Sequence, residues 1–326
     1  MKVVILGASS KTDVPGIESI TDTVDLAFAP DEVALGVELL GSEILVGWDF
    51  QGNELVHQWH RALDLKWIHW CGAGVDAVLF EDLQKSDVVL TNARGIFDRV
   101  MAEYVLGYML VETKDFITTR KNQENHVWNS RSIAKLQGDH VLVFGVGSIG
   151  REIARVLKTI GLRVSGVGRS ERKNDPDFYK VYASSNIGSA LPESNWVIGV
   201  LPSTPETVQF FDAAFFSKMN SGARFINIGR GDAVVEADLI NALEQSTIAG
   251  AMLDVFNTEP MKQNDPLWDA PNLLASPHMS GEYQGYVADV VNQFKDNLEK
   301  YMAGQQLLNI VDKSLGFVPS SPERTD

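Results

Sequence analysis

The feature that most constrains the fold is a glycine-rich turn between an apolar segment and a helical one. Gly145-Val146-Gly147-Ser148-Ile149-Gly150 follows the apolar run His140–Phe144 and opens the amphipathic segment Ile149–Thr159. In such strand–turn–helix units the glycines allow a tight turn, close approach to a pyrophosphate and close helix–strand packing. We therefore predict a dinucleotide site with the diphosphate on the helix amides. A purely structural turn is the alternative, because 27 glycines make chance matches easy.

Short apolar runs alternate with helical or polar stretches along the whole chain. Alternation of this kind predicts βαβ units with buried parallel strands. Strands are expected at Val3–Leu6, Leu26–Ala29, Glu43–Val46, Lys66–Trp70, Val88–Leu90, His140–Phe144, Leu162–Val167, Trp196–Leu201, Arg224–Ile228, Ile248–Asp254 and Leu273–Ser276. Helices are expected at Asn53–Arg61, Phe80–Lys85, Asp98–Lys121, Ile149–Thr159, Glu236–Glu244 and Tyr286–Ala303. The polar stretch Asn122–Asn129 is expected to be a loop, and the tail from Lys313 to Asp326 to be frayed.

Length and composition narrow the class of protein. A chain of 326 residues suggests two domains, so we predict an α/β protein with two Rossmann-like doubly wound parallel-sheet domains and a cleft between them. The net charge of −15 argues against a nucleic-acid binder. The single cysteine, Cys71, fits a reducing compartment, and no run approaches a membrane span. We expect a cytoplasmic protein.

The end of the second strand of the glycine-turn unit bears on cofactor choice. NAD-binding units usually place an acid there for the ribose hydroxyls, but this chain has Arg169 followed by Ser170, with Arg172 nearby. A guanidinium can pair with a 2′-phosphate. The sequence therefore predicts NADP(H), with NAD as the weaker possibility. A solvated charge cluster is the structural alternative, and Glu171 counts mildly against the prediction.

Three ionisable residues follow three apolar runs in the second half of the chain. Arg230, Glu259 and His278 each come after an expected strand, and the carboxyl ends of parallel strands line the ligand crevice. Singly, each has an ordinary structural explanation. Together they supply a fork for a carboxylate, a proton donor, and an acid that keeps the donor protonated. They predict reduction of a 2-oxo acid, with His278 as general acid.

Seven ordered motifs resemble the D-2-hydroxyacid dehydrogenase family, of the NAD(P)-dependent 2-oxo-acid or glyoxylate/hydroxypyruvate reductase type. They are Cys71–Asp76, Ala102–Gly107, Gly145–Gly150, Leu201–Thr207, Arg230, Asp254 with Glu259, and Pro277-His278. The resemblance implies that Arg230 binds substrate, Glu259 supports His278, and Ala73 and Gly74 hold the substrate carboxylate. It also implies a discontinuous substrate-binding domain, 1–97 plus 285–326, around a dinucleotide-binding domain, 98–284, and a homodimer formed through the latter.

The cofactor contacts expected from these motifs extend beyond the glycine turn. They comprise Gly145, Gly147, Ser148, Ile149, Gly150, Arg169, Ser170, Arg172, Leu201, Pro202, Thr207, Ile228, Gly229, Asp254, Ser280 and Gly281. The substrate pocket departs from the pattern of the family at two positions, because Tyr283 stands where many relatives have Thr and Phe97 where polar residues are frequent. Trp48 and Phe50 would form an apolar wall that favours larger aliphatic or aromatic 2-oxo acids over glyoxylate.

The sequence leaves two other kinds of function to consider. A dinucleotide-sensing, corepressor-like binding protein on the same fold is the alternative, although no segment resembles a dedicated docking element. His57 and His60, three residues apart, are half of a possible metal site that no carboxylate or cysteine pattern completes, so no metal is predicted. The sequence thus favours an NADPH-dependent reductase of small 2-oxo acids.

Overall fold

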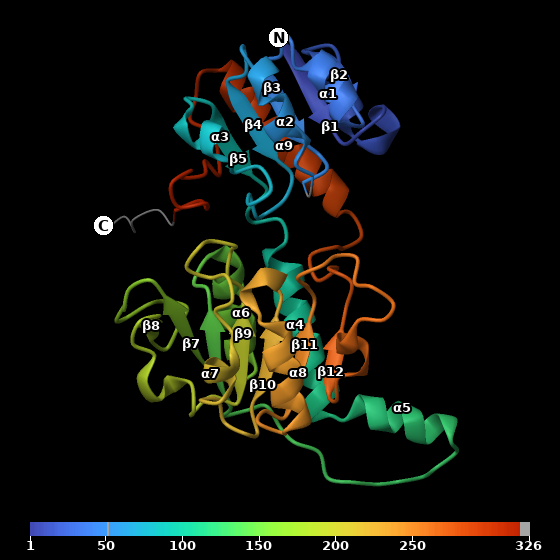
Figure 1. The fold of residues 1–326 in the computed structure, drawn as a ribbon, viewed down its shortest axis with the longest axis vertical. Helices are drawn as coiled ribbons and strands as arrows, with labels where there is room; N and C mark the ends of the chain where they lie inside the picture. Colours follow the sequence, from blue (N-terminus) through green and yellow to red (C-terminus); the bar gives the residue numbers. More distant parts are fainter. Residues whose placement is uncertain (51, 320–326) are drawn as a thin grey trace. The chain divides into compact units, whose positions relative to one another are not determined.

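The chain forms two compact units, each built on one parallel sheet. The computed structural model describes residues 1–50 and 52–319. Unit 1 comprises Met1–Phe97 together with the chain from Tyr283 onward, and unit 2 comprises Asp98–Glu282. Both sheets are parallel throughout (Figure 1), which confirms the predicted α/β class with two Rossmann-like sheets.

Unit 1 carries a five-stranded sheet in the order β2-β1-β3-β4-β5. Its strands are β1 (Lys2–Leu6), β2 (Asp25–Ala29), β3 (Ile44–Gly47), β4 (Trp67–Trp70) and β5 (Val89–Asn92). Its α-helices are α1 (Glu32–Glu38), α2 (Glu54–Gln58), α3 (Glu81–Lys85) and α9 (Tyr286–Met302). Strands β3 and β4 are buried along their whole length, as expected for central strands covered on both faces.

Unit 2 carries a seven-stranded sheet in the order β12-β11-β10-β9-β6-β7-β8. The strands are β6 (His140–Phe144), β7 (Arg163–Gly168), β8 (Val181–Ala183), β9 (Trp196–Gly199), β10 (Arg224–Asn227), β11 (Gly250–Leu253) and β12 (Leu273–Ala275). The helices are α4 (Asp98–Thr113), α5 (Phe116–Glu124), α6 (Ser148–Thr159), α7 (Ala213–Phe216) and α8 (Glu236–Glu244). The strand order reverses between β6 and β9, the switch point at which such sheets bind ligands.

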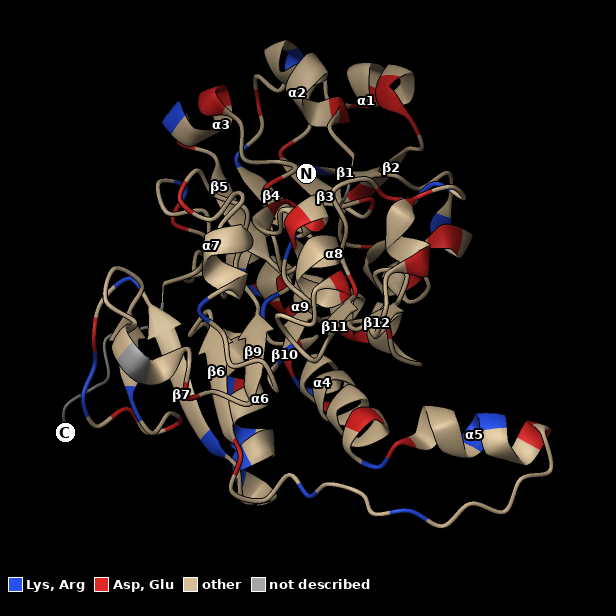
Figure 2. Ribbon diagram, turned by 60° about the horizontal axis from the view of Figure 1, so that its bottom comes forward, with Lys and Arg blue, Asp and Glu red and all other residues tan. Residues whose placement is uncertain are grey.

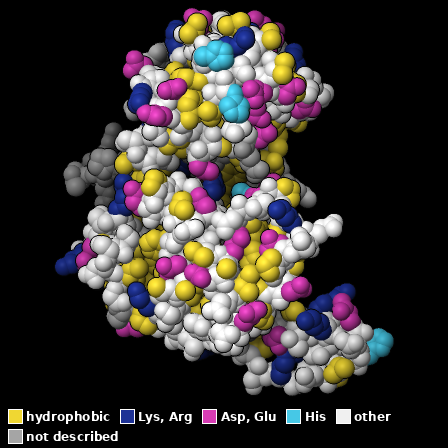
Figure 3. Space-filling view, in the orientation of Figure 1, with side chains coloured by type: hydrophobic (Ala, Val, Ile, Leu, Met, Phe, Trp, Pro, Cys, Tyr) yellow, Lys and Arg dark blue, Asp and Glu magenta, His cyan; other side chains and the backbone are white. Residues whose placement is uncertain are grey.

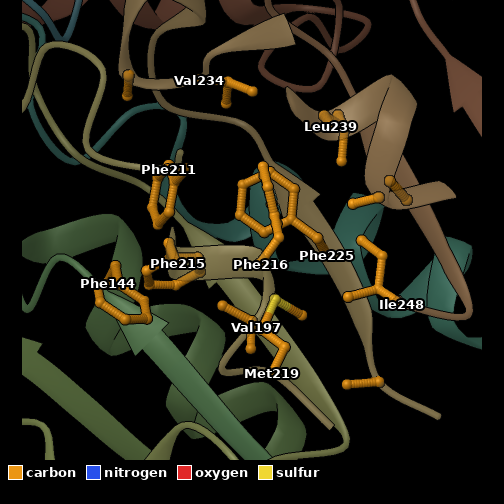
Figure 4. Packing of buried hydrophobic residues seen from close by; sticks show 14 of the residues in the cluster. Phe144, Val197, Phe211, Phe215, Phe216, Met219, Phe225, Val234, Leu239 and Ile248 are labelled. Carbon is orange, nitrogen blue, oxygen red and sulfur yellow. The ribbon is translucent and has the colours of Figure 1, made fainter. Parts of the chain in front are cut away.

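An aromatic cluster holds the centre of unit 2 together. Phe144, Phe211, Phe215, Phe216 and Phe225 are all buried, and the rings of Phe211 and Phe215 meet edge to face with their centroids 4.9 Å apart (Figure 4). Edge-to-face pairs add to the stabilisation from buried area. Because the cluster includes residues of β6 and β10, it fixes two strands whose carboxyl ends carry the candidate site.

The expected single helix over Asp98–Lys121 is wrong. The structure has two helices, α4 ending at Thr113 and α5 beginning at Phe116. Asp115 between them adopts a left-handed φ of 50°, and its carboxylate accepts a 2.5 Å hydrogen bond from Arg131 Nε. The expected loop at 122–129 begins only after α5 ends at Glu124, and α5 projects from the rest of unit 2 (Figure 1).

The expected frayed tail is also wrong for residues 313–319. Lys313 Nζ donates to the carbonyls of Leu83, Ser86 and Val88 at 3.0, 2.6 and 2.9 Å. These carbonyls stand at the end of α3 and before β5, so the lysine closes a turn of unit 1. Residues 320–326 of the predicted tail lie outside the described residues.

The surface carries charge of both signs. On the face drawn in Figure 3, Asp and Glu side chains are interspersed with Lys and Arg over both units. Within residues 1–50 and 52–319, no helix has the length and apolarity needed to cross a membrane.

Candidate active site

The glycine turn joins β6 to α6 and uses its three glycines differently. Gly145 has a φ of 111°, and a Cβ there would lie 2.5 Å from the carbonyl oxygen of Val200. A Cβ on Gly150 would lie 1.9 Å from the carbonyl oxygen of Gly145. A Cβ on Gly147, at the N-cap of α6, would meet no atom within 4 Å. Two glycines are thus required by the turn itself, whereas the third leaves open space over the helix start.

The loop after β9 lies beside the turn that follows β10. Thr207 Oγ1 donates to the carbonyl of Pro202 at 2.6 Å and accepts from the amide of Thr204 at 2.9 Å. A Cβ on Gly229 would lie 2.7 Å from backbone atoms of Leu201. The hydroxyl of Thr207, expected to contact the cofactor, therefore stabilises the conformation of its own loop by bonding to the loop backbone.

Arg230 follows β10, at the same sheet edge as the glycine turn. Its backbone carbonyl accepts a 2.9 Å hydrogen bond from Asn227 Nδ2, and its Nη1 donates to the carbonyl of Gly229 at 3.0 Å. A Cβ on Gly231 would lie 2.0 Å from the carbonyl carbon of Phe256, so only glycine fits after Arg230. Close backbone packing therefore fixes the position of the Arg230 backbone, from which the side chain extends.

Glu259 and His278 form a hydrogen-bonded pair at the ends of β11 and β12. Glu259 Oε2 lies 2.6 Å from His278 Nδ1, and Glu259 Oε1 accepts from the amide of Phe256 at 2.8 Å. With Nδ1 engaged by the carboxylate, Nε2 is the nitrogen left for a substrate. His278 is itself in the left-handed region, with a φ of 50°, and its amide donates to the carbonyl of Asp254 at 2.8 Å.

The electrostatics of this pair suit a proton donor. The hydrogen bond that His278 donates to Glu259, together with the charge of Glu259, holds the pKa of His278 above its usual value, against the opposing effects of burial and of Arg230. Burial acts to raise the pKa of Glu259, but the hydrogen bonds from His278 and Phe256 and the charges of His278 and Arg230 keep it below its usual value. The pair is therefore biased towards imidazolium and carboxylate.

Asp254 builds the loop that carries His278. Its carboxylate is fully buried, with Oδ1 accepting from Ser276 Oγ at 2.6 Å and from the amide of Met279 at 3.0 Å. Oδ2 accepts from the amide of Ser280 at 2.9 Å. Asp254 and Ser280, both expected as cofactor contacts, are thus engaged with each other, while Gly281 follows directly in the chain.

The substrate residues expected in unit 1 follow its strands. Asn92 Nδ2, at the end of β5, donates to the carbonyl of Ala73 at 2.5 Å, next to Gly74. Trp48 follows β3, is half-buried, and its amide donates to the carbonyl of Leu6 at 3.0 Å. Tyr283 begins the second chain segment of unit 1, where its hydroxyl hydrogen-bonds to Asp289.

Comparison with known proteins identifies the family. Residues 106–280 match the NAD-binding domain of D-isomer specific 2-hydroxyacid dehydrogenases. A crystal structure of a member of that family from Aeromonas salmonicida is 31% identical, with a TM-score of 0.82 over 96% of this chain and 99% of that one. This chain belongs to the D-isomer specific 2-hydroxyacid dehydrogenase family. The resemblance predicted from the motifs is confirmed, and the protein is an oxidoreductase of this NAD(P)-dependent class.

Two further crystal structures of this fold contain the phosphorylated cofactor. The NADPH-dependent glyoxylate/hydroxypyruvate reductase from Sinorhizobium meliloti, in complex with NADP and sulfate, is 27% identical, with a TM-score of 0.84 over 97% of this chain and 100% of that one. The D-isomer specific 2-hydroxyacid dehydrogenase from Xanthobacter autotrophicus, in complex with NADPH and MES, is 27% identical, with a TM-score of 0.79 over 97% and 99%.

The residues of this dehydrogenase at the glycine turn fit a dinucleotide. The open space at Gly147, over the helix start at Ser148, is a space that a side chain on residue 147 would fill. Ile228 is buried directly after β10, which β9 separates from β6 in the sheet. Arg169 and Ser170 are exposed directly after β7, and Arg172 is partly buried beside them.

Several residues that shape the site were not predicted from the sequence. Asn92, Asn227 and Ser276 are buried polar residues at or next to strand ends, and each bonds to a loop that carries a candidate residue. The sequence signal that could have identified them is a polar residue at the end of an apolar run. His57, weighed as half a metal site, pairs instead with Glu32 at 2.9 Å, and among the described residues no group of three or more potential ligands gathers.

Proposed function

We propose that this dehydrogenase uses NADPH to reduce a small 2-oxo acid to a D-2-hydroxy acid. The observation that carries the proposal is the His278–Glu259 pair, 2.6 Å apart, with Arg230 close enough to act electrostatically on both. The proposal assigns proton donation to His278 and substrate binding to Arg230.

The chain's residues divide the work of carbonyl reduction. The nicotinamide, when bound, supplies the hydride. Arg230 presents a planar fork suited to a carboxylate and polarises the adjacent carbonyl. His278 delivers its Nε2 proton to the carbonyl oxygen as negative charge develops there, and Glu259 stabilises the imidazolium beforehand. From unit 1, the backbone at Ala73 and Gly74 holds the carboxylate in this proposal.

The preference for NADPH rests on residues after β7. The exposed Arg169 and Ser170 occupy the position at which an NAD-specific site offers an acid, and Arg172 adds a second guanidinium. Two similar proteins described above were crystallised with NADP or NADPH. For the substrate, Trp48 and Phe50 after β3 support a preference for larger aliphatic or aromatic 2-oxo acids.

A panel of 2-oxo acids assayed with NADPH and with NADH tests the proposal. We expect turnover with at least one acid, a D product, and a clear NADPH preference. Absence of turnover on every acid would favour the corepressor-like alternative, and a clear NADH preference would overturn the cofactor assignment.

Binding of the cofactor can be tested apart from turnover. Gly147→Ala places a methyl group in the open space over the helix start, so we expect at least tenfold weaker NADPH binding by titration of cofactor fluorescence, with folding intact. Gly107→Ala is the matched control, because its Cβ also meets no atom within 4 Å but lies in the interior of α4. Equal NADPH affinities in the two variants would contradict placement of the diphosphate at Gly147.

We also propose a homodimer formed through unit 2. The arm made of α5 and the segment after it exposes apolar side chains, with Trp128 fully exposed and Phe116 and Ile133 more than half exposed. Exposed apolar patches of this kind mark interaction surfaces. Light scattering of the wild type and of Trp128→Glu tests this, with a dimer expected for the former and weaker association for the latter.

A further inference from the structure

The loop between β7 and β8, residues 169–180, is fastened to helix α6 by ion pairs. Arg151 donates from Nη1 and Nη2 to the two oxygens of Asp175, both at 2.9 Å, and from Nη1 to Asp177 at 2.7 Å. Arg155, one turn further along α6, donates to both oxygens of Asp177 at 2.8 and 3.0 Å. Figure 2 shows basic and acidic segments together near α6.

The Arg151–Asp175 pair is withdrawn from solvent, unlike most ion pairs of the surface, whereas Arg155 is 55% exposed. The side chains of Asp175 and Arg151 are 3% and 16% exposed. Asp175 Oδ1 also accepts from the amides of Asp177 and Phe178 at 3.1 and 3.4 Å. A buried bidentate pair with further amide donors defines one geometry strongly. The loop therefore has little freedom at Asp175.

Asp175 faces Arg172 as well as Arg151. Its Oδ2 lies 3.7 Å from Arg172 Nη1. The backbone of Arg172 is held separately, because it exchanges hydrogen bonds of 3.1 and 3.3 Å with Val181 of β8. Arg172 Nη2 lies 3.8 Å from the place a Cβ on Gly168 would take, at the end of β7. The guanidinium thus lies beside the end of β7, the strand end near which the adenosine ribose is expected.

The positive charges of the two arginines on α6 offset the negative charges of the two loop aspartates, so the network does not repel an anion bound nearby. Unpaired carboxylates at Asp175 and Asp177 would repel a phosphate dianion, but Arg151 and Arg155 neutralise them. Arg169 and Arg172 then supply the positive charge at the end of β7. Arginine is not interchangeable with lysine in such bidentate pairs.

We infer that Asp175 is a positioning residue for NADPH selectivity: held by Arg151, it orients the Arg172 guanidinium towards the 2′-phosphate. The inference rests on the proposed function, since it assumes a cofactor phosphate at this loop. It adds to the cofactor site two residues that do not directly follow a strand, Arg151 of α6 and Asp175 of the β7–β8 loop.

The test is the affinity of the full-length protein for NADPH and for NADH, each measured by cofactor fluorescence titration. Asp175→Asn removes the charge facing Arg172 but keeps one acceptor oxygen for the loop amides. We expect NADPH to bind about tenfold more weakly, the order of one lost hydrogen bond to a charged group. NADH affinity should change by less than twofold, which a general loosening of the loop would not produce.

A double-mutant comparison isolates the role of Arg172. In an Arg172→Gln background, Asp175→Asn should cause no further loss of NADPH affinity, because the residue through which it acts is gone. Glu81→Gln, which removes one carboxylate from an exposed pair with Lys85 in unit 1, is the charge-matched control and should bind both cofactors as the wild type does. If Asp175→Asn does not fold, Arg151→Lys, which keeps the charge but loses the fork, carries the same expectation.

The outcomes separate this inference from the proposed function. A wild type that prefers NADPH, with selectivity unchanged by Asp175→Asn, overturns only the inference. Tighter NADPH binding in Asp175→Asn also overturns it, since Asp175 would then compete with the phosphate for Arg172. A wild type without NADPH preference overturns the cofactor assignment and the inference together.

Discussion

Two histidines, one in each unit, show how position along a strand decides what the same side chain can do. His69 lies inside β4 of unit 1, fully buried, with Nδ1 3.0 Å from Thr91 Oγ1 and its ring 5.4 Å from that of Phe294. Burial lowers its pKa to about 3. His278 follows β12 of unit 2, where Glu259 raises its pKa.

The difference lies in whether a charged partner accompanies the ring. Within a buried strand, neighbouring apolar side chains penalise the imidazolium and no carboxylate offsets the penalty. At a strand end, loops can bring a glutamate to 2.6 Å of the ring while leaving it partly exposed. We therefore expect a histidine at a strand end to transfer protons, and a histidine buried within a strand to make the stability of the fold depend on pH.

The largest effect is expected from removing the strand-end histidine. His278→Ala deletes the only proposed proton donor, so kcat/KM for 2-oxo-acid reduction should fall about 10³-fold. NADPH affinity by titration should stay within a few-fold, because the glycine turn is untouched. Steady-state kinetics with the best acid of the panel measure this. Retention of more than a tenth of the wild-type activity would remove His278 from the mechanism.

Glu259→Gln should slow proton donation by His278 and shift the pH dependence of 2-oxo-acid reduction. Reduction needs protonated His278, so the rate falls as pH rises through the pKa of that residue. In the wild type this pKa lies above its usual value, and without the carboxylate it drops. We expect the alkaline limb of kcat to shift to lower pH and activity at pH 8 to fall about 10- to 100-fold. Identical pH profiles would show that Glu259 does not set the pKa.

Features fixed by local pattern are those that the sequence predicts well. Strand β6 and helix α8 have the predicted bounds, because each is a continuous apolar or amphipathic run. Arg230, Glu259 and His278 each follow such a run, and parallel strands bring their carboxyl ends to one edge. The clustering of these three side chains could therefore be inferred before the fold was known.

Features fixed by long-range contacts could not be predicted. The break at Asp115 depends on Arg131 rather than on a glycine or proline between the helices. The pairing of Arg151 with Asp175 joins residues 24 positions apart that share no periodicity. Lys313 is ordinary in the sequence, and only the fold shows the three carbonyls that it bonds.

The strand-interior histidine predicts a stability effect that depends on pH. The folded-state pKa of His69, about 3, lies below the unfolded value of about 6.5, so the folded state binds fewer protons. Stability is complete above pH 6.5 and is lost as pH falls towards 3, by about 2 kcal/mol at pH 5. Urea unfolding of unit 1 should show that His69→Leu loses less stability than the wild type between pH 7 and pH 5. An equal loss in both would place the acid sensitivity elsewhere, and His60→Gln, at an exposed histidine of unit 1, serves as the control.

The smallest effect is expected at a third histidine, which has a partner but no burial. His57 Nδ1 lies 2.9 Å from Glu32 Oε2, a contact like that of His278 with Glu259, but the two side chains are 54% and 42% exposed. Water and salt screen such a pair, and ordering two exposed side chains offsets its gain. His57→Gln should leave kcat, its pH profile and the thermal midpoint of unit 1 within experimental error of the wild type, at low and at high salt. A pH profile that moved with His57 would mean that a carboxylate partner alone, without burial or a place at a sheet edge, makes a histidine functional in this protein.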